Sequence, residues 1–190
     1  MTDLNNIVCD QSSESLILDP FDRLKADDPD AAWIVLQTRS RQEKAVAADL
    51  AALGVGHFLP LIDTVRYYGK RKARVELPLL PGYVFLHGTL DEAYQADRLK
   101  RIANILRVTD QDQIDWELRN IHLALREGAG LDPHPFLQVG VRVEVTSGPF
   151  QGLQGIVEDR RRLDRVVLQV NYLQQAMSLE IDAGLLQVID

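Results

Sequence analysis

The stretch "ELPLLPGYVFL", residues 76–86, places two prolines and a glycine directly before a run of strand-forming residues. Proline cannot donate to a strand ladder and glycine weakens a strand, so the stretch predicts a turn that leads into a strand at Tyr83. Tyr83 and Phe85 are two residues apart, which puts both on one face of a strand. That face is either part of the core or an aromatic surface that receives a partner.

The segments around this stretch predict one α+β domain over residues 31–128. "WIVLQT" (33–38) is typical of a buried strand, and Ser40 with Glu43 predicts a capping box for a helix over 41–53. Further patterns predict a strand over 57–62, a hairpin over 65–77, a helix over 91–101, a strand at "NILRVT" (104–109) and a helix over 112–128.

The remaining segments predict a tail, a linker and a second module. Residues 1–30 carry eight acidic and two basic residues, and their composition predicts a mostly disordered tail. Residues 129–138 contain two prolines and lack periodicity, which indicates a linker. Short alternating strands over 139–190 predict a small all-β barrel. Its β-branched strands and the glycine-rich turn "SGPFQGLQG" oppose a helical form of this module.

Composition limits the class of protein. The chain has 190 residues and a net charge of −7, but residues 31–130 carry fourteen basic against twelve acidic residues. This balance excludes coating of nucleic acid by charge alone and permits a local basic site. A single cysteine allows no internal disulfide and no cysteine metal cluster, which predicts a cytoplasmic protein. No apolar run predicts a membrane helix or a signal peptide.

Catalytic patterns are missing from the sequence. The four histidines show no metal-ligand spacing, no serine lies in a "GxSxG" turn, and the glycines of "GPFQGLQG" precede a strand and not a helix. We therefore expect no enzyme activity, no metal and no cofactor.

Three basic groups could meet an anion. The first lies in the hairpin "RYYGKRKAR", where tyrosines could stack on bases; the alternative is a solvated hairpin tip. The second ends a helix, where cations also suit the helix dipole. The third begins a helix, where cations oppose the dipole, so an external anion explains it better. The groups are Arg66, Lys70, Arg71, Lys72 and Arg74; Arg98, Lys100 and Arg101; and Arg39, Arg41 and Lys44.

"WIVLQTRSRQEKA", "FLPLI" and "LPLLPGYVFL", followed by "VGVRVEVTSGPFQGLQGIVED", resemble the NusG family of transcription elongation factors. The first part resembles its NGN domain, which implies an antiparallel sheet flanked by helices, and the second resembles its KOW domain, so the resemblance covers residues 31–190. The stretch "RYYGKRKARVELPLLPGYVFL" and the ending "NYLQQAMSLEID" are similar to the RfaH-like members that serve polysaccharide operons.

The resemblance implies a monomeric elongation or antitermination factor with no membrane partner. Tyr83, Phe85, Ile105 and Val108 would bind the β′ clamp helices of RNA polymerase. Phe150 would bind a second factor, Rho or the ribosomal protein NusE. The positions that match the DNA-facing side, for upstream or non-template DNA, are Arg39, Arg41, Lys44, Tyr94, Gln95, Arg98, Lys100 and Arg101. The alternative is a KOW-type RNA- or ribosome-binding protein, in which the hairpin is the site and Tyr83 and Phe85 are core.

Overall fold

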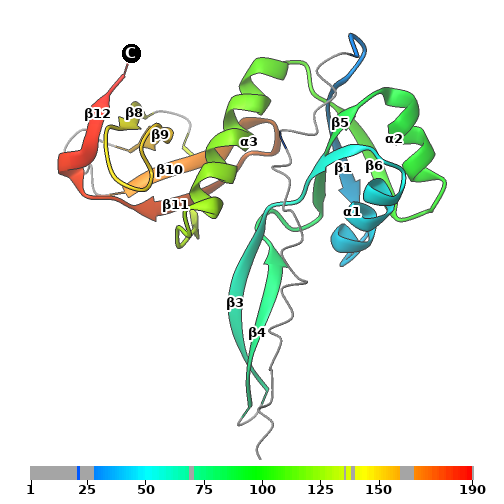
Figure 1. Ribbon diagram of the computed structural model, residues 1–190, viewed down its shortest axis with the longest axis horizontal. Coiled ribbons are helices and arrows are strands. Elements are labelled where there is room, and N and C mark those ends of the chain that lie inside the picture. Colours follow the sequence, from blue (N-terminus) through cyan, green and yellow to red (C-terminus); the bar gives the residue numbers. More distant parts are fainter. Residues whose placement is uncertain are drawn as a thin grey trace, which may run out of the picture.

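The computed structural model describes residue 21 and residues 28–68, 71–134, 136–137, 140–158 and 165–189, with only the backbone of residues 66–68 and 71. Two sheets lie on either side of one long helix, α3 (Gln111–Arg126), and a two-stranded hairpin extends away from them (Figure 1). We call the two sheets the N-terminal sheet and the C-terminal sheet.

The N-terminal sheet has four antiparallel strands in the order β2-β5-β1-β6, which confirms the predicted antiparallel sheet with helices. In β1, Val35 lies opposite Phe85 on one side and Leu106 on the other. The elements are β1 (Ala32–Thr38), α1 (Glu43–Ala52), β2 (Gly56–Phe58), β5 (Tyr83–Gly88), α2 (Leu90–Asp97) and β6 (Ile102–Arg107).

Both faces of β1 are buried, as its continuous apolar run predicts. Successive side chains of a strand point to opposite faces. Ile34 and Leu36 therefore pack with residues of α1 and α2, while Trp33 and Val35 pack with residues of α3. The sheet is thus the middle layer between α1 and α2 on one side and α3 on the other.

The predicted capping box at Ser40 and Glu43 is wrong. α1 begins at Glu43, its N-cap residue is Gln42, and no side chain of the described residues caps it. The Glu43 side chain is buried and accepts a hydrogen bond from the backbone N–H of Gly82 instead. A capping box does occur in α2, where Thr89 and Glu92 bond each other's backbone.

The hairpin consists of β3 (Leu61–Tyr68) and β4 (Arg71–Pro78), which pair only with each other among the described strands. Pro60 separates β2 from β3, so the strand predicted over 57–62 is divided in two. Both ends of the hairpin return to the N-terminal sheet, and its far end projects away from the rest of the chain (Figure 1).

The C-terminal sheet is all-β, as predicted, with six strands in the order β12-β8-β9-β10-β11-β7. Its first strand comes from the predicted linker, because Asp132, Pro133 and His134 pair with β11. The strands are β7 (Asp132–His134), β8 (Val141–Val145), β9 (Gln154–Val157), β10 (Arg165–Val170), β11 (Gln175–Glu180) and β12 (Leu186–Val188), with the short helices η1 (Asn171–Leu173) and η2 (Ala183–Leu185).

One residue of the predicted tail belongs to the core. Phe21 is only 9% exposed, and its ring centroid lies 5.7 Å from that of Trp33, 5.5 Å from Phe58 and 5.3 Å from His122. The guanidinium of Arg119 lies 4.8 Å from the Phe21 ring. Residues 1–20 and 22–27 of the tail lie outside the described residues. None of the helices in the described part of the chain could cross a membrane.

Candidate functional site

The face of the N-terminal sheet that packs against α3 answers the question raised by Tyr83 and Phe85. The strand pairing arranges its side chains in rows across the sheet. One row contains Phe85, Val35 and Leu106, and the next contains Tyr83, Gln37 and Asn104. The two aromatic residues therefore share a face, as predicted, but they occupy different rows.

Phe85 is core. It is fully buried in the cluster that includes Val35 and residues of α3 such as Leu118. Tyr83 lies at the margin of this cluster and is half-buried, together with Leu79 and Leu106. We call Tyr83, Leu79 and Leu106 the apolar edge. It is the part of this face that a partner could cover without unfolding the domain.

The loop before Tyr83 is held by a defined contact. Gly82 has a φ of 87°, in the left-handed region that glycine adopts without strain. Its N–H donates to the Glu43 carboxylate at 2.8 Å, and its carbonyl accepts the N–H of Thr38 at 2.8 Å. These bonds attach the loop to α1 and β1 and so fix the backbone position of Tyr83.

Two residues predicted for the same surface lie elsewhere. Ile105 is opposite Leu36 and packs against the α1 and α2 side of the sheet. Val108 follows the end of β6 and lines a hollow of about 200 Å³ beside Trp33, toward the opposite end of β1 from Tyr83. Leu106 takes the place that the sequence assigned to Ile105. The signal for Leu106 is its register with Val35, which depends on pairing that the sequence alone does not fix.

The third row contains Trp33 and His87, whose rings meet edge to face at 5.0 Å. His87 Nδ1 is buried and has no hydrogen-bond partner among the described residues. Burial lowers the pKa of His87, while the nearby Asp115 carboxylate acts in the opposite direction. His87 is therefore a neutral, structural side chain at neutral pH, and this row contributes packing to the face.

A basic corner forms where the loop before α1 meets the loop before β6. The N–H of Arg39 donates to the carbonyl of Arg101 at 2.8 Å, which joins the two loops. Arg41 and Lys100 have φ values of 60° and 58°, in a region that costs a side-chain-bearing residue free energy. We call Arg39, Arg41, Lys100 and Arg101 the basic corner. Strained residues gather at functional sites more often than elsewhere.

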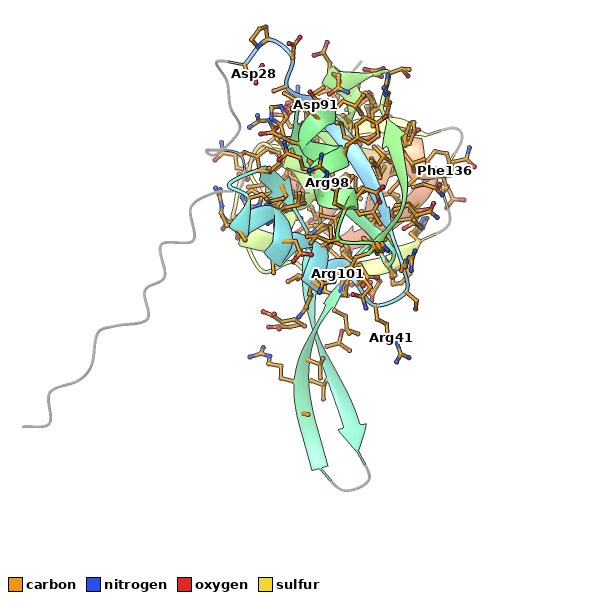
Figure 2. The ribbon with its side chains drawn as sticks, turned by 90° about the vertical axis from the view of Figure 1, so that its right-hand side faces the viewer. Asp28, Arg41, Asp91, Arg98, Arg101 and Phe136 are labelled. Carbon is orange, nitrogen blue, oxygen red and sulfur yellow. The ribbon has the colours of Figure 1, made fainter. Side chains whose placement is uncertain are left out.

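The cations of this corner differ in how far they are already neutralised. Arg101 pairs with Asp49 of α1. Lys44 lies outside the corner and pairs with Glu76 of the hairpin at 3.2 Å. Arg41 is exposed and points away from the body of the molecule, and Arg98 and Arg101 are visible in the same view (Figure 2). Arg41 is thus well placed to meet an external anion.

The remaining residues of the predicted DNA-facing side lie on α2 or on the hairpin. Tyr94 is 51% exposed, and Gln95 and Arg98 are exposed near the same end of α2. On the hairpin, Lys72 and Arg74 are exposed, and Arg74 lies 3.4 Å from Asp63. The predictions for the side chains of Arg66, Lys70 and Arg71 lie outside the described residues.

Phe150 lies in the turn between β8 and β9 and is half-buried against the core. It lines a hollow of about 370 Å³ together with Ala129, beyond the end of α3, and with Arg165 and Glu180 of the C-terminal sheet. Among the described residues, no three histidine, cysteine, aspartate or glutamate side chains are grouped to hold a metal ion.

Comparison with known proteins connects this geometry to a family. Residues 31–118 match the model of the NusG family, described as transcription termination factor nusG. The matched part contains the N-terminal sheet, the hairpin and the first half of α3, so both the apolar edge and the basic corner lie in the NusG-like part of the chain.

Solved structures and curated proteins add less. Two similar structures are described as "Crystal Structure of MjSpt4:Spt5 complex conformation A" and "conformation B". The first is 16% identical, with a TM-score of 0.27, and the match covers 83% of this chain and 98% of that chain. The second is 16% identical, with a TM-score of 0.28, and the match covers 83% of this chain and 97% of that chain. Such scores do not establish a common fold. No curated protein matches the chain.

Proposed function

We propose that this chain is a transcription elongation factor that binds RNA polymerase through the apolar edge of its NusG-like part. The observation that carries the proposal is the family match over residues 31–118, which includes Tyr83 and its neighbours. Tyr83 is half-buried and directly follows a loop that is hydrogen-bonded to α1, and an aromatic anchor held in this way is typical of protein-binding hot spots. The partner surface is that of the β′ clamp helices.

The basic corner binds the upstream or non-template DNA beside the polymerase. Arg41 and Lys100 supply charge from strained, exposed loops, and Arg98 and Tyr94 extend the same side along α2. Cations that contact phosphates add affinity that depends on salt and not on sequence. Phosphate contacts at this corner would hold the factor in place and would not by themselves select one operon.

The factor would act by a shift of populations. Binding to the elongating state of the polymerase, in preference to a paused state, stabilises elongation by the difference between the two binding free energies. The C-terminal sheet is a KOW-type module in this proposal, and Phe150 and its hollow receive a second factor, Rho or NusE. In its more specific form, the proposal is that the factor suppresses termination and acts on a single polysaccharide operon.

One specific observation favours a second candidate, a KOW-type RNA- or ribosome-binding protein. The hairpin projects away from the body (Figure 1). Lys72 and Arg74 on it are exposed. Affinity purification of the tagged chain separates the two. Recovery of RNA polymerase supports the first candidate, and recovery of ribosomal RNA without polymerase supports the second. The Tyr83→Ala variant should lose polymerase while a Lys72→Ala, Arg74→Ala variant retains it.

A further inference from the structure

Helix α3 has two contact faces. Ile114, Leu118 and Ile121 are buried against the N-terminal sheet. Trp116, Glu117 and Asn120 contact the C-terminal sheet. The helix therefore lies between the two sheets, as Figure 1 also shows, and contacts both of them.

The second face makes specific polar contacts. The indole N–H of Trp116 donates to the side-chain oxygen of Gln154 at 2.9 Å, and the backbone N–H of Gln154 donates to Asn120 Oδ1 at 2.6 Å. The guanidinium of Arg142 lies 4.7 Å from the centre of a Trp116 ring, within the range of a cation–π contact. β8 and β9 are thereby placed against α3 in one orientation.

Glu117 is the centre of this contact. It is only 2% exposed, and both of its carboxylate oxygens accept the backbone N–H of Asn171 at 3.2 Å. The Asn171 side-chain amide and Gln113 Nε2 also donate to it. A buried carboxylate costs free energy unless donors surround it. Two of its three donor groups belong to Asn171 in the other module, so Glu117 is satisfied only when the C-terminal sheet is in place.

Apolar packing and the chain path support the same arrangement. The core that contains Leu118 and Ile121 continues without a break into the C-terminal sheet, through residues such as Val157 and Met177. The space left between Trp116, Glu117 and the C-terminal sheet is about 10 Å³, which is room for about one water molecule. The linker is short as well, because Asp132–His134 already form β7.

We infer that this face of α3 is the docking surface for the chain's own C-terminal sheet, and that Glu117 is the positioning residue that holds the two modules together as one rigid body. The contact is specific, because it satisfies the buried Glu117 carboxylate and joins Trp116 and Asn120 to Gln154 by hydrogen bonds. The C-terminal module does not move freely on a tether.

The two tryptophans of the chain test this in the full-length protein. The Trp33 indole N–H donates to Asp115 inside the NusG-like part at 3.0 Å, whereas that of Trp116 donates across the contact. Hydrogen exchange of the two indole N–H groups, followed by nuclear magnetic resonance, reports the two places separately. We expect both to be protected. A Trp116 indole that exchanges like an exposed one, beside a protected Trp33, would overturn the inference.

Variants of Glu117 and Asn171 identify the positioning role. Glu117→Ala removes the acceptor of the central hydrogen bonds, and Asn171→Asp replaces the donating amide by a carboxylate that repels Glu117. Each variant should accelerate exchange at Trp116 by about tenfold or more and leave exchange at Trp33 unchanged. Glu117→Gln keeps an acceptor and should retain protection, and Asp112→Asn on the same helix is the matched control. Unchanged exchange at Trp116, or equal acceleration of both indoles, would contradict a docking role for Glu117.

Discussion

The Glu43 carboxylate accepts the backbone N–H of Gly82 at 2.8 Å, so the start of α1 supports the loop that presents Tyr83. A hydrogen bond to a charged group contributes about 1.5–3 kcal/mol, and its loss leaves a buried donor unsatisfied. We expect Glu43→Ala to lower the free energy of unfolding by about this amount in denaturant titrations. Glu43→Gln, which keeps an acceptor, should cost less, and equal losses would contradict this role.

Single substitutions should separate Tyr83 from Phe85. Phe85 is fully buried, so Phe85→Ala should lower the free energy of unfolding by about 3–5 kcal/mol. Tyr83 is half-buried, and Tyr83→Ala should weaken polymerase binding by about 2 kcal/mol or more with a smaller loss of stability. Thermal melting and polymerase affinity are measured on both variants. A folded Tyr83→Ala variant with normal affinity would remove Tyr83 from the proposed site.

Arg41 can be used to test whether a strained backbone conformation accompanies DNA binding by the same residue. Its φ of 60° suits glycine, so Arg41→Gly should leave stability unchanged or raise it by up to about 1 kcal/mol. The same variant should bind DNA more weakly, with a salt slope smaller by about 0.9 for one lost phosphate contact. Arg41→Ala is the control, because it removes the charge and keeps the strained backbone. Unchanged DNA affinity in both variants would remove Arg41 from the DNA site.

Phe21 should matter for stability although it lies in the acidic tail. It fills a space between Trp33, Phe58 and His122, and truncating a buried phenylalanine costs about 3–5 kcal/mol. Phe21→Ala should therefore lower the melting temperature, whereas Phe21→Leu should recover part of the loss. A melting temperature that does not change would show that the tail contributes nothing to the core.

The pH dependence of stability should reveal Glu117. Burial raises its pKa, against the opposing effect of the hydrogen bonds from Gln113 and Asn171, and Asp110 raises it further. Above the raised pKa the folded protein must bury a charge that the unfolded chain leaves in water. Glu117→Gln should therefore be more stable than the wild type at neutral pH. This advantage should shrink as the pH falls through the raised pKa toward about 4.3, the ordinary value for glutamate.

Denaturant titrations at several pH values, on the wild type and on Glu117→Gln, measure this difference directly. Arg142 and Glu144 also lie at the contact and are present in both proteins, so their effects cancel in the comparison. A difference in stability that does not depend on pH would mean that the pKa of Glu117 is the same in the folded and the unfolded protein, and would contradict the raised pKa.

The parts of the fold that could be predicted depend on local patterns. The run at 33–36 is apolar at every position because both faces of β1 are covered, and α3 shows its stripe of Ile114, Leu118 and Ile121 at helical spacing. The turn before Tyr83 follows from its prolines and glycine. Each of these patterns lies within one short segment, so it can be recognised without knowing which distant residues that segment contacts.

The remainder depends on contacts between distant segments. The choice between Ile105 and Leu106 rests on the register of β6 against β1, which shifts between Gln37 and Thr38. The Glu43 side chain accepts a hydrogen bond from a distant loop and not from the nearby helix end, so the local pattern predicted a capping box that does not form. Phe21 is a single aromatic residue in a polar segment, and no periodicity marks it as core.

The hairpin leaves its two outer strand edges unpaired, because β3 and β4 pair only with each other among the described strands. Open edges invite other chains to add strands and aggregate. Lys72, Arg74 and Glu76 are exposed at every second position of β4, and Asp63 is exposed on β3. An apolar strand that joined either edge would have to bring its side chains against these charges and displace their water. The same charges that suit the hairpin to a polyanion therefore also keep a long, unsupported ribbon from acting as a template for aggregation.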